Sequence, residues 1–497
     1  MKRPTGLCNR LLVGSLLGLL IIYALLLIPD PALPPPPAGT ARPFVWNQDQ
    51  YWSRLEASFL SARELDPSVL ADSIRSGLAR TGVLLDSCQS MELQLSSPLL
   101  AQVETTVFEL GALLGAQTNQ LPEFIKVHNR LRAIVKDQSR YWDMNAPEAK
   151  SRLYRLLYGA RTAVDEIMLQ TRPGSIPALV TADDEPSVTP SSEILGVAIH
   201  SGDILVSRGG APTSSLIARG SDYPGNFSHV ALVHIDEATG KVSIVESHIE
   251  RGVVVSSVEE YLNDTKLRIL VLRLRADHPA LVTDPMLPHK AATEALARIR
   301  RDHVAYDFEL NSGDNSKYFC SEVAFDPYRR VGVRLWPGMS TISSAGVRSW
   351  LAAFGVTHFE TMEPSDLEYD PQLRVVAEWR DPETLYKDHL DNAVIDVMLE
   401  GAEAGEKLNY DRYKLPLARV LKGYSMLKNL WGGVGPIPEG MNATAALKND
   451  RFSKRHTAIK ERLIKAASEF QQTRGYRPPY WELVKLARSA KAECDRN

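Results

Sequence analysis

Three kinds of hydrophobic pattern follow one another along the chain, and each predicts a different kind of structure. Residues 11–28 form an unbroken run of apolar and small residues with one Ser. From about 46 to 170, apolar residues recur at helical spacing, which predicts a helical bundle. From about 195 to 380, the apolar runs are short, β-branched and separated by Gly, Asp and Asn, as in strands. Helical spacing returns after Asp381-Pro382, a capping residue followed by Pro.

The first apolar run predicts a membrane anchor. Its length is just sufficient for a helix that crosses a bilayer. Lys2, Arg3 and Arg10 precede it, so we expect the N-terminus in the cytoplasm and the rest of the chain in the periplasm or outside the cell. A cleaved signal peptide is the competing interpretation. Pro-Asp-Pro follows the run where a small-x-small cleavage site would be needed, which favours an uncleaved single-pass anchor in the inner membrane.

The patterns and the Pro-rich stretches divide the chain into six segments. A chain of 497 residues is too long for one core, so two or three folded domains are expected. The predicted segments are the cytoplasmic tip and anchor 1–28, a stiff Pro-rich spacer 29–45, a helical domain 46–172, a linker 173–194, a strand-rich domain 195–380 and a helical C-terminal region 381–497. We therefore predict an α+β fold with an antiparallel sheet between two helical regions.

Individual elements can be located within these segments. Ser97-Pro98 predicts a helix start. In the strand-rich domain a helix is expected at 288–301 and another beginning at Cys320. Asp236 to Gly240 has the composition of a hairpin loop. The predicted strands are 204–206, 230–235, 242–245, 253–255, 267–274 and 373–379.

Composition excludes some functions and leaves others open. The net charge is -3 and no long basic stripe is present, so no nucleic-acid partner is expected. Gly432 to Pro436 superficially resembles a phosphate loop, but it follows no strand and lacks Lys-Ser/Thr, and no cofactor is predicted. Four Cys do not make a disulfide scaffold, although Cys88 and Cys494 could pair if the fold brought them together.

Three residues of the strand-rich domain have the chemistry of a nucleophile and its partners. His229 begins a buried strand, Glu246 ends the next one, and Cys320 lies where a loop becomes a helix. A helix N-terminus lowers the pKa of a cysteine, and an imidazole can complete the ion pair and protonate a leaving group. A carboxylate on the neighbouring strand can hold the imidazole in the right tautomer.

The motifs around these residues resemble those of a known family. Ser-Gly-Asp-Ile-Leu, Phe-Ser-His-Val-Ala-Leu-Val, Val-Glu-Ser and Tyr-Phe-Cys-Ser-Glu-Val follow one another over residues 195–380. In this order they are similar to the permuted papain-like group of the NlpC/P60 superfamily (YiiX/YebB-like), which is related to the lecithin:retinol acyltransferase group. The resemblance implies that His229 is the base, Glu246 the orienting residue and Cys320 the nucleophile.

Several details around this site stay open. His248 is a rival to Glu246 for the third position. Pro327 lies two turns into the helix that Cys320 begins, so that helix must be short or kinked. The backbone N–H of Cys320 is the expected oxyanion donor, because amides of the first helical turn have no intrahelical partner. Further candidates for the oxyanion or the pocket are Tyr318, Tyr306, Ser228, Asp203 and Asp307.

The sequence supports four functions to different degrees. The leading prediction is a cysteine amidase or peptidase acting through an acyl-enzyme, with cell-wall peptide as substrate. The same residues would also serve an acyltransferase, thioesterase or lipase acting on lipid; a wide apolar groove beside Cys320 would favour lipid. A buried Cys320, or one that points away from His229, would favour a binding or scaffold protein that uses the helical regions as its working surface. A metal site of His229, His234, His248 and Glu246 is disfavoured, because alternation puts His229 and His234 on opposite faces, so no metal is predicted. Protein partners of the helical regions stay unknown.

Overall fold

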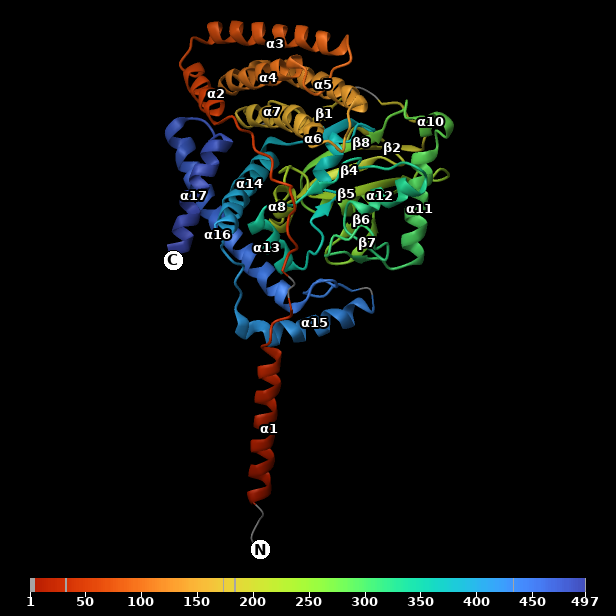
Figure 1. Ribbon diagram of the computed structural model, residues 1–497, viewed down its shortest axis with the longest axis vertical. Coiled ribbons are helices and arrows are strands. Elements are labelled where there is room, and N and C mark those ends of the chain that lie inside the picture. Colours follow the sequence, from red (N-terminus) through yellow and green to blue (C-terminus); the bar gives the residue numbers. More distant parts are fainter. Residues whose placement is uncertain (1–4, 32–33, 173, 183–184, 432, 497) are drawn as a thin grey trace.

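The computed structural model has a folded body from which one helix projects (Figure 1). It describes residues 5–31, 34–172, 174–182, 185–431 and 433–496; side chains are described from residue 14 onward. The projecting helix is α1 (Thr5–Leu26), the predicted anchor. Lys2, Arg3, Pro173, Asp183, Asp184 and Gly432, which entered the sequence predictions, lie outside the described residues, and the side chains of Cys8 and Arg10 do too.

The segment after the spacer folds into helices, as the spacing predicts. Their apolar faces share one core that includes Leu85, Leu114 and Phe124. Ser97 occupies the predicted cap position, but its side chain makes no capping hydrogen bond. The helices are α2 (Asp49–Ala62), α3 (Pro67–Gln89), α4 (Pro98–Ala116), α5 (Leu121–Gln138), α6 (Pro147–Leu153), a π-helical turn (Tyr154–Tyr158) and α7 (Gly159–Leu169).

A seven-stranded antiparallel sheet forms the centre of the body, in the order β1-β13-β8-β4-β5-β6-β7. All six predicted strands are present, each within a few residues of its expected bounds, and the α+β architecture is confirmed. The strands are β1 (Leu179–Thr181), β4 (Ile204–Gly209), β5 (His229–Ile235), β6 (Val242–His248), β7 (Gly252–Ser256), β8 (Lys266–Leu274) and β13 (Leu373–Trp379).

The predicted linker 173–194 is not wholly irregular. Its Leu179–Thr181 pairs with β13 as the edge strand β1, and Ser191–Ile194 (β2) pairs with Val197–His200 (β3). Both strands are too short for their period-two pattern to stand out among the surrounding Pro residues. Tertiary pairing, which a local pattern does not contain, produces them.

The two faces of the sheet carry different layers. One face packs on α11 (Leu287–Arg301) and α12 (Glu322–Arg330). The other packs on the β2–β3 hairpin and α9 (Val258–Asn263). The remaining short elements are α8 (Pro212–Arg219), α10 (Pro279–Thr283), β9 (Ala305–Tyr306), β10 (Lys317–Tyr318), β11 (Ser340–Thr341) and β12 (Glu360–Thr361).

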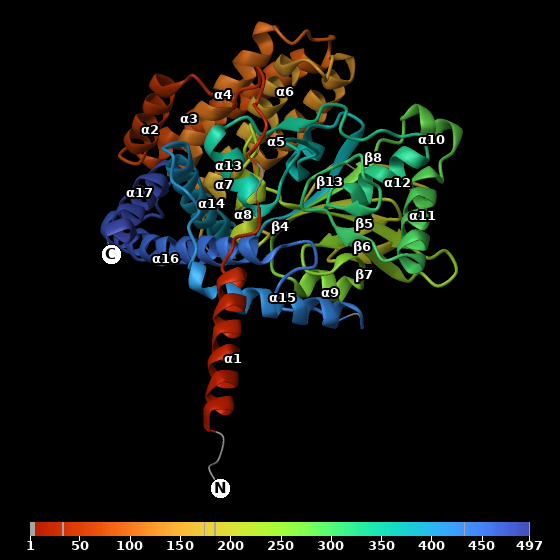
Figure 2. The ribbon, with the colours of Figure 1, turned by 60° about the horizontal axis from the view of Figure 1, so that its bottom comes forward.

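The C-terminal region is helical, as predicted. Helices α13, α14, α16 and α17 share a core with Trp350, Leu463 and Leu483. Helix α15 lies across the base of the body next to α1, where it shares a smaller core with the start of α16 (Figures 1 and 2). The helices are α13 (Ala345–Phe354), α14 (Pro382–Glu403), α15 (Leu415–Asn429), α16 (Ala443–Arg474) and α17 (Tyr480–Arg496).

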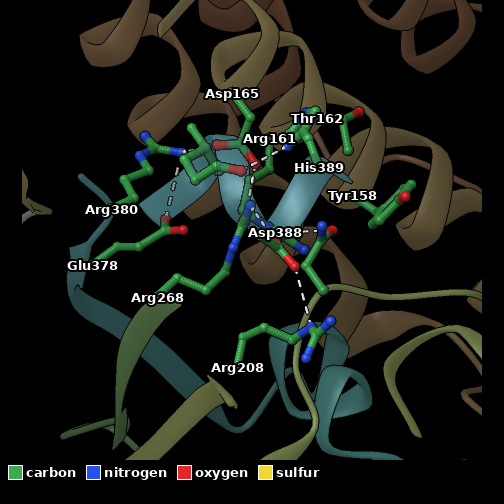
Figure 3. A network of polar contacts seen from close by, with 12 residues as sticks. Tyr158, Arg161, Thr162, Asp165, Arg208, Arg268, Glu378, Arg380, Asp388 and His389 are labelled. Carbon is green, nitrogen blue, oxygen red and sulfur yellow. Dashed lines mark hydrogen bonds and ion pairs between the residues drawn. The ribbon is translucent and has the colours of Figure 1, made fainter. Parts of the chain in front are cut away.

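A buried charge network joins the helical regions to the sheet (Figure 3). Asp165 of α7 bridges Arg268 of β8 at 2.9 Å and Arg380, just after β13, at 3.1 Å. Asp388 of α14 bridges Arg268 at 2.9 Å and Arg208 of β4 at 3.1 Å. These side chains are 0% exposed, so each charge depends on its partners in place of water.

The structure also bears on the predicted disulfide and anchor. Cys88, Cys320 and Cys494 are free thiols, so Cys88 and Cys494 do not pair. Among the described residues, α4 is the one helix long and apolar enough to cross a membrane by length and composition, and 50% of that span is buried in the body. Gly14–Leu26 is a shorter apolar segment, and the large side chains along it are exposed.

Candidate active site

Neighbouring strands bring together His229, Glu246 and His248. Glu246 lies opposite Ala231 in the register of β5 and β6, and His248 lies opposite Gly252 of β7. Glu246 Oε2 is 2.9 Å from His229 Nε2, and Glu246 Oε1 is 3.1 Å from His248 Nε2. Ser256 Oγ donates to Glu246 Oε1 at 2.6 Å. One carboxylate, 1% exposed, therefore holds both imidazoles.

Burial and hydrogen bonding set the charges of this cluster. Burial raises the pKa of Glu246, but hydrogen bonds from His229 and His248 outweigh it and leave the pKa below its usual range. Burial lowers the pKa of His229, and the hydrogen bond to Glu246 offsets this only in part. His229 is therefore neutral at neutral pH. With Nε2–H donated to Glu246, Nδ1 carries the lone pair that a general base needs.

Cys320 lies in the turn that leads into α12, as the sequence indicates. The Glu322 carboxylate accepts the Phe319 N–H at 3.0 Å and braces this turn. Helix α12 has nine residues and includes Pro327, so it is short, as expected. The backbone N–H of Cys320 makes no hydrogen bond with any other described residue, which leaves it free to bind a ligand.

The thiol itself is not in the state that the sequence predicts. Cys320 is 5% exposed, and its Sγ lies 3.7 Å from the carbonyl oxygen of Ser228. Burial, and secondarily the charge of Glu363, raise the pKa of the thiol to about 12. The expected lowering by a helix N-terminus and an imidazole is thus wrong for this arrangement, because burial dominates and no imidazole reaches the sulfur.

The Cys320 thiol and the His229 imidazole lie on opposite faces of the sheet at the start of β5. Val230 packs in the core that contains α12, whereas Ala231 packs in the core on the other face. Because side chains alternate along a strand, the His229 imidazole lies on the Ala231 face with Glu246. Among the described residues, no hydrogen bond joins Cys320 to His229. Of the two contacts that the predicted triad needs, the structure contains the His229–Glu246 hydrogen bond, and the described residues lack the one between Cys320 and His229.

A small apolar cavity of about 60 Å³ lies beside Cys320. Tyr306, Met362 and Glu363 are among its lining residues. Sequence reasoning missed Glu363, because it stands in no motif and comes from the segment after β12. Burial raises its pKa to about 8, with the nearby Asp366 charge acting in the same direction. Ser256 was also missed, since a Ser at a strand end carries no distinctive signal.

The remaining predicted residues are divided between the site and the framework. Tyr306 lines the Cys320 cavity, and Ser228 contacts the thiol through its carbonyl. The Tyr318 hydroxyl instead bonds Asp326 and Arg298, so the structure does not bring it to Cys320. Asp203 binds Arg273 with both carboxylate oxygens, each at 2.9 Å. Asp307 accepts the Glu309 and Asn311 N–H groups and shapes a turn.

The four-residue metal site considered from the sequence does not assemble. His234 stacks on His289 with ring centroids 5.3 Å apart, away from the other histidines. His229, Glu246 and His248 by themselves offer ligand atoms within 4.8 Å of one another, a spacing at which a metal ion could bind. In the present arrangement their hydrogen bonds pair the same atoms with each other.

The site lies in an α+β domain in which the strand that carries His229 precedes the helix that follows Cys320. Comparison with protein families agrees: residues 198–377 match the family described as permuted papain-like amidase enzyme, YaeF/YiiX, C92 family. This part of the chain therefore belongs with the permuted papain-like proteins, and the predicted resemblance to the YiiX group is confirmed. No curated protein matches the chain. No solved structure matches it either.

Proposed function

We propose that the protein is a cysteine amidase that uses Cys320 as nucleophile, His229 as general base and Glu246 as the residue that orients His229. The observation that carries the proposal is the buried His229–Glu246 hydrogen bond of 2.9 Å, on the strand beside Cys320, inside the region that matches an amidase family. Glu246 takes the third position, because it contacts His229 directly, whereas His248 binds the other carboxylate oxygen.

In the first half of the reaction, His229 Nδ1 takes the proton of the Cys320 thiol, and the thiolate attacks the amide carbonyl carbon. The free N–H of Cys320 supports the developing oxyanion. The carbon–nitrogen bond breaks, and His229 gives its proton to the leaving amine. Water, deprotonated by His229, then cleaves the thioester and releases a carboxylic acid and the thiol. Sγ must leave the Ser228 carbonyl to reach Nδ1, and such hydrogen bonds commonly close only with substrate bound.

Two substrate classes follow from the site and the anchor. An enzyme held at the outer side of the inner membrane by α1 meets cell-wall peptide amides, which we propose as the first substrate class. The second candidate is an acyl lipid cleaved or transferred by the same residues; the lining beside Cys320 is apolar, as this candidate needs, but it does not form the wide groove that would favour lipid over peptide. The cavity is small, so it accommodates a short apolar group at the carbonyl and not a whole acyl chain.

The pH dependence of Cys320 alkylation in the full-length protein in detergent tests this proposal. Mass spectrometry resolves each Cys, and burial raises the pKa of Cys88 to about 11, which makes it the internal control. The proposal requires that Sγ leaves the Ser228 carbonyl in solution and pairs with His229 Nδ1. We therefore expect Cys320 to label well below pH 8 through that opened arrangement, and labelling to slow at least tenfold in His229→Ala. Labelling that begins only toward the resting thiol's pKa, with no effect of His229→Ala, would refute the proposal and favour a binding scaffold.

A chelator separates the cysteine mechanism from a metal site. Because the proposal needs the lone pair of the neutral His229 imidazole and no metal, EDTA should leave the labelling rate of Cys320 unchanged. Added Zn²⁺ should slow it, since His229, Glu246 and His248 are suitable ligands and a bound ion would remove the base. Acceleration by Zn²⁺, or loss of labelling with EDTA, would contradict the role assigned to His229.

A further inference from the structure

Helix α15 has an apolar face that no part of the described chain covers. The residues Leu417, Val420, Tyr424, Leu427 and Trp431, here called the outer face, are 50% to 87% exposed. The first four recur at intervals of three and four residues and so lie on one side of α15, and Trp431 follows two residues after the helix ends at Asn429. The opposite side, with Leu415 and Ala418, is buried against Ile437 and Met441. Elsewhere on the body, exposed apolar side chains are scattered, which is normal for a protein surface.

The place of α15 in the molecule indicates what covers the outer face. α15 runs across the body end of α1 in both views of the structure (Figures 1 and 2). Arg412 Nε donates to the carbonyl of Leu27 at 2.9 Å, and Arg419 donates to the carbonyl of Ile28 and to Asp30 at 3.2 Å. These contacts fix α15 at the level where the apolar run of α1 ends, which is the level of the lipid headgroups if α1 crosses the bilayer.

The charges around α15 fit the same surface. Residues 411–431 contain a single acidic residue, Asp411. The basic residues in that stretch are Arg412, Lys414, Arg419, Lys422 and Lys428. A helix with an apolar face, flanking Lys and Arg, and Tyr or Trp at its edge is suited to the boundary between acyl chains and anionic headgroups.

We propose that α15 is an interfacial membrane helix whose outer face inserts into a bilayer containing anionic lipid. Together with α1, which this proposal takes to be the anchor, it would hold the body in one orientation on the membrane. The loop after α15 contacts the catalytic domain: Gly440 approaches the Phe308 ring and the carbonyl oxygen of Tyr306, whose ring lines the Cys320 cavity. This loop therefore connects α15 to the wall of the Cys320 cavity.

Trp431 provides the test. It is 87% exposed and the one exposed tryptophan among the described residues, and the apolar run of α1 contains none. The full-length protein is reconstituted into vesicles of phosphatidylcholine and phosphatidylglycerol whose acyl chains are brominated near the headgroup. We expect the lipid bromines to quench tryptophan fluorescence in the wild type and to quench Trp431→Phe at most half as much. Leu427→Glu, which keeps Trp431, should also weaken quenching.

Controls separate this inference from the anchor. Val83→Glu makes the same kind of change on α3 at 65% exposure, far from α1, and should leave quenching unchanged (Figure 1). Flotation of the vesicles reports insertion of α1 independently. Protein that floats while Trp431 is quenched by aqueous iodide and not by bromine would overturn the proposal for α15 alone. A Trp431 shielded from both quenchers would also overturn it, because a second protein surface would then cover the outer face.

Discussion

The substitution Asp165→Asn tests whether buried charges hold the helical region on the sheet. The Asp165 carboxylate accepts Arg268 on one oxygen and Arg380 on the other, and all three side chains are 0% exposed. An Asn amide can accept on its oxygen only, so its NH₂ group would face one of the two guanidinium groups. The variant therefore removes a negative charge that Arg268 and Arg380 share where α7, β8 and the end of β13 meet (Figure 3). Among the described residues, Arg268 then keeps only Asp388 at 2.9 Å, and Arg380 only Glu378 at 3.7 Å, so the buried network carries more positive than negative charge at this point.

Removing one partner of a buried ion pair costs about 3–5 kcal/mol. The entropy of unfolding is about 2.1 cal/mol/K per residue, so a body of roughly 450 residues that unfolds as one unit would lose about 3–5 °C in Tm. Thermal unfolding of the full-length protein in detergent, followed by intrinsic fluorescence, measures this. Asp72→Asn is the matched control, because the Arg75–Asp72 pair is 67% and 68% exposed and should shift Tm by less than ~1 °C.

The pH dependence of the difference in Tm between the wild type and Asp165→Asn provides a second test. Burial raises the pKa of Asp165, but Arg268 and Arg380 outweigh it and leave the pKa below its usual value. A depressed folded-state pKa stabilises the protein above the unfolded pKa of about 3.9, and this contribution is lost as pH falls through the folded value. The difference in Tm between wild type and Asp165→Asn should therefore narrow in acid. Equal melting of the two proteins at neutral pH would refute the reasoning, since it would mean that no buried cation depends on this carboxylate.

Two further substitutions probe the site. Glu246→Gln replaces a carboxylate that binds both imidazoles with an amide that accepts hydrogen bonds on one oxygen only. Alkylation of Cys320 at neutral pH should therefore slow by about 10- to 150-fold, the equivalent of ~1.5–3 kcal/mol. An unchanged rate would show that Glu246 is not part of the triad. Burial holds the pKa of Glu363 at about 8 in the folded protein, above the unfolded value of 4.5. Between these two pH values the carboxyl is ionised in the unfolded chain and protonated in the fold, so stability falls as pH rises through that range. The Tm of Glu363→Gln should therefore rise relative to that of the wild type across that range. Above pH 8 its Cys320 should also be alkylated a few-fold faster, because the variant lacks a charge that raises the pKa of the thiol. A difference in Tm that does not change with pH would show that Glu363 does not titrate there.

Sequence reasoning located the central sheet well, for a physical reason. Strands such as β5 and β8 are buried over most of their length, and each contains a continuous run of apolar residues, 230–233 in β5 and 269–272 in β8. The hairpin after β5 also follows its local signal, because Asp236 Oδ1 accepts the Thr239 N–H at 2.9 Å and Gly240 takes a φ of +67°. By contrast, β1 has three residues and depends on pairing with β13 from nearly two hundred residues later, which no local pattern reveals.

The site was predictable as a set of residues and not as an arrangement. The motif order identified His229, Glu246 and Cys320, and strand register explains why the first two touch. The direction of the thiol was not accessible, because it depends on a rotamer and on the carbonyl of Ser228. Glu363 was not accessible either, since the fold brings it to the cavity from outside every motif.

For the outer face of α15 the sequence pattern was present, but it did not predict that this face would be exposed. Apolar residues at spacings of three and four predict a helix with a buried face, and α15 does bury one, around Leu415. The sequence does not reveal that a second stripe, from Leu417 to Trp431, stays uncovered, since this depends on where the body ends. Burial is a property of the assembled molecule, and α15 lies at the one end of the body from which α1 leaves (Figure 2). An exposed apolar stripe at that position would be a liability in water and is stabilising at a membrane, which is why its occupant can be inferred from the structure and not from the sequence.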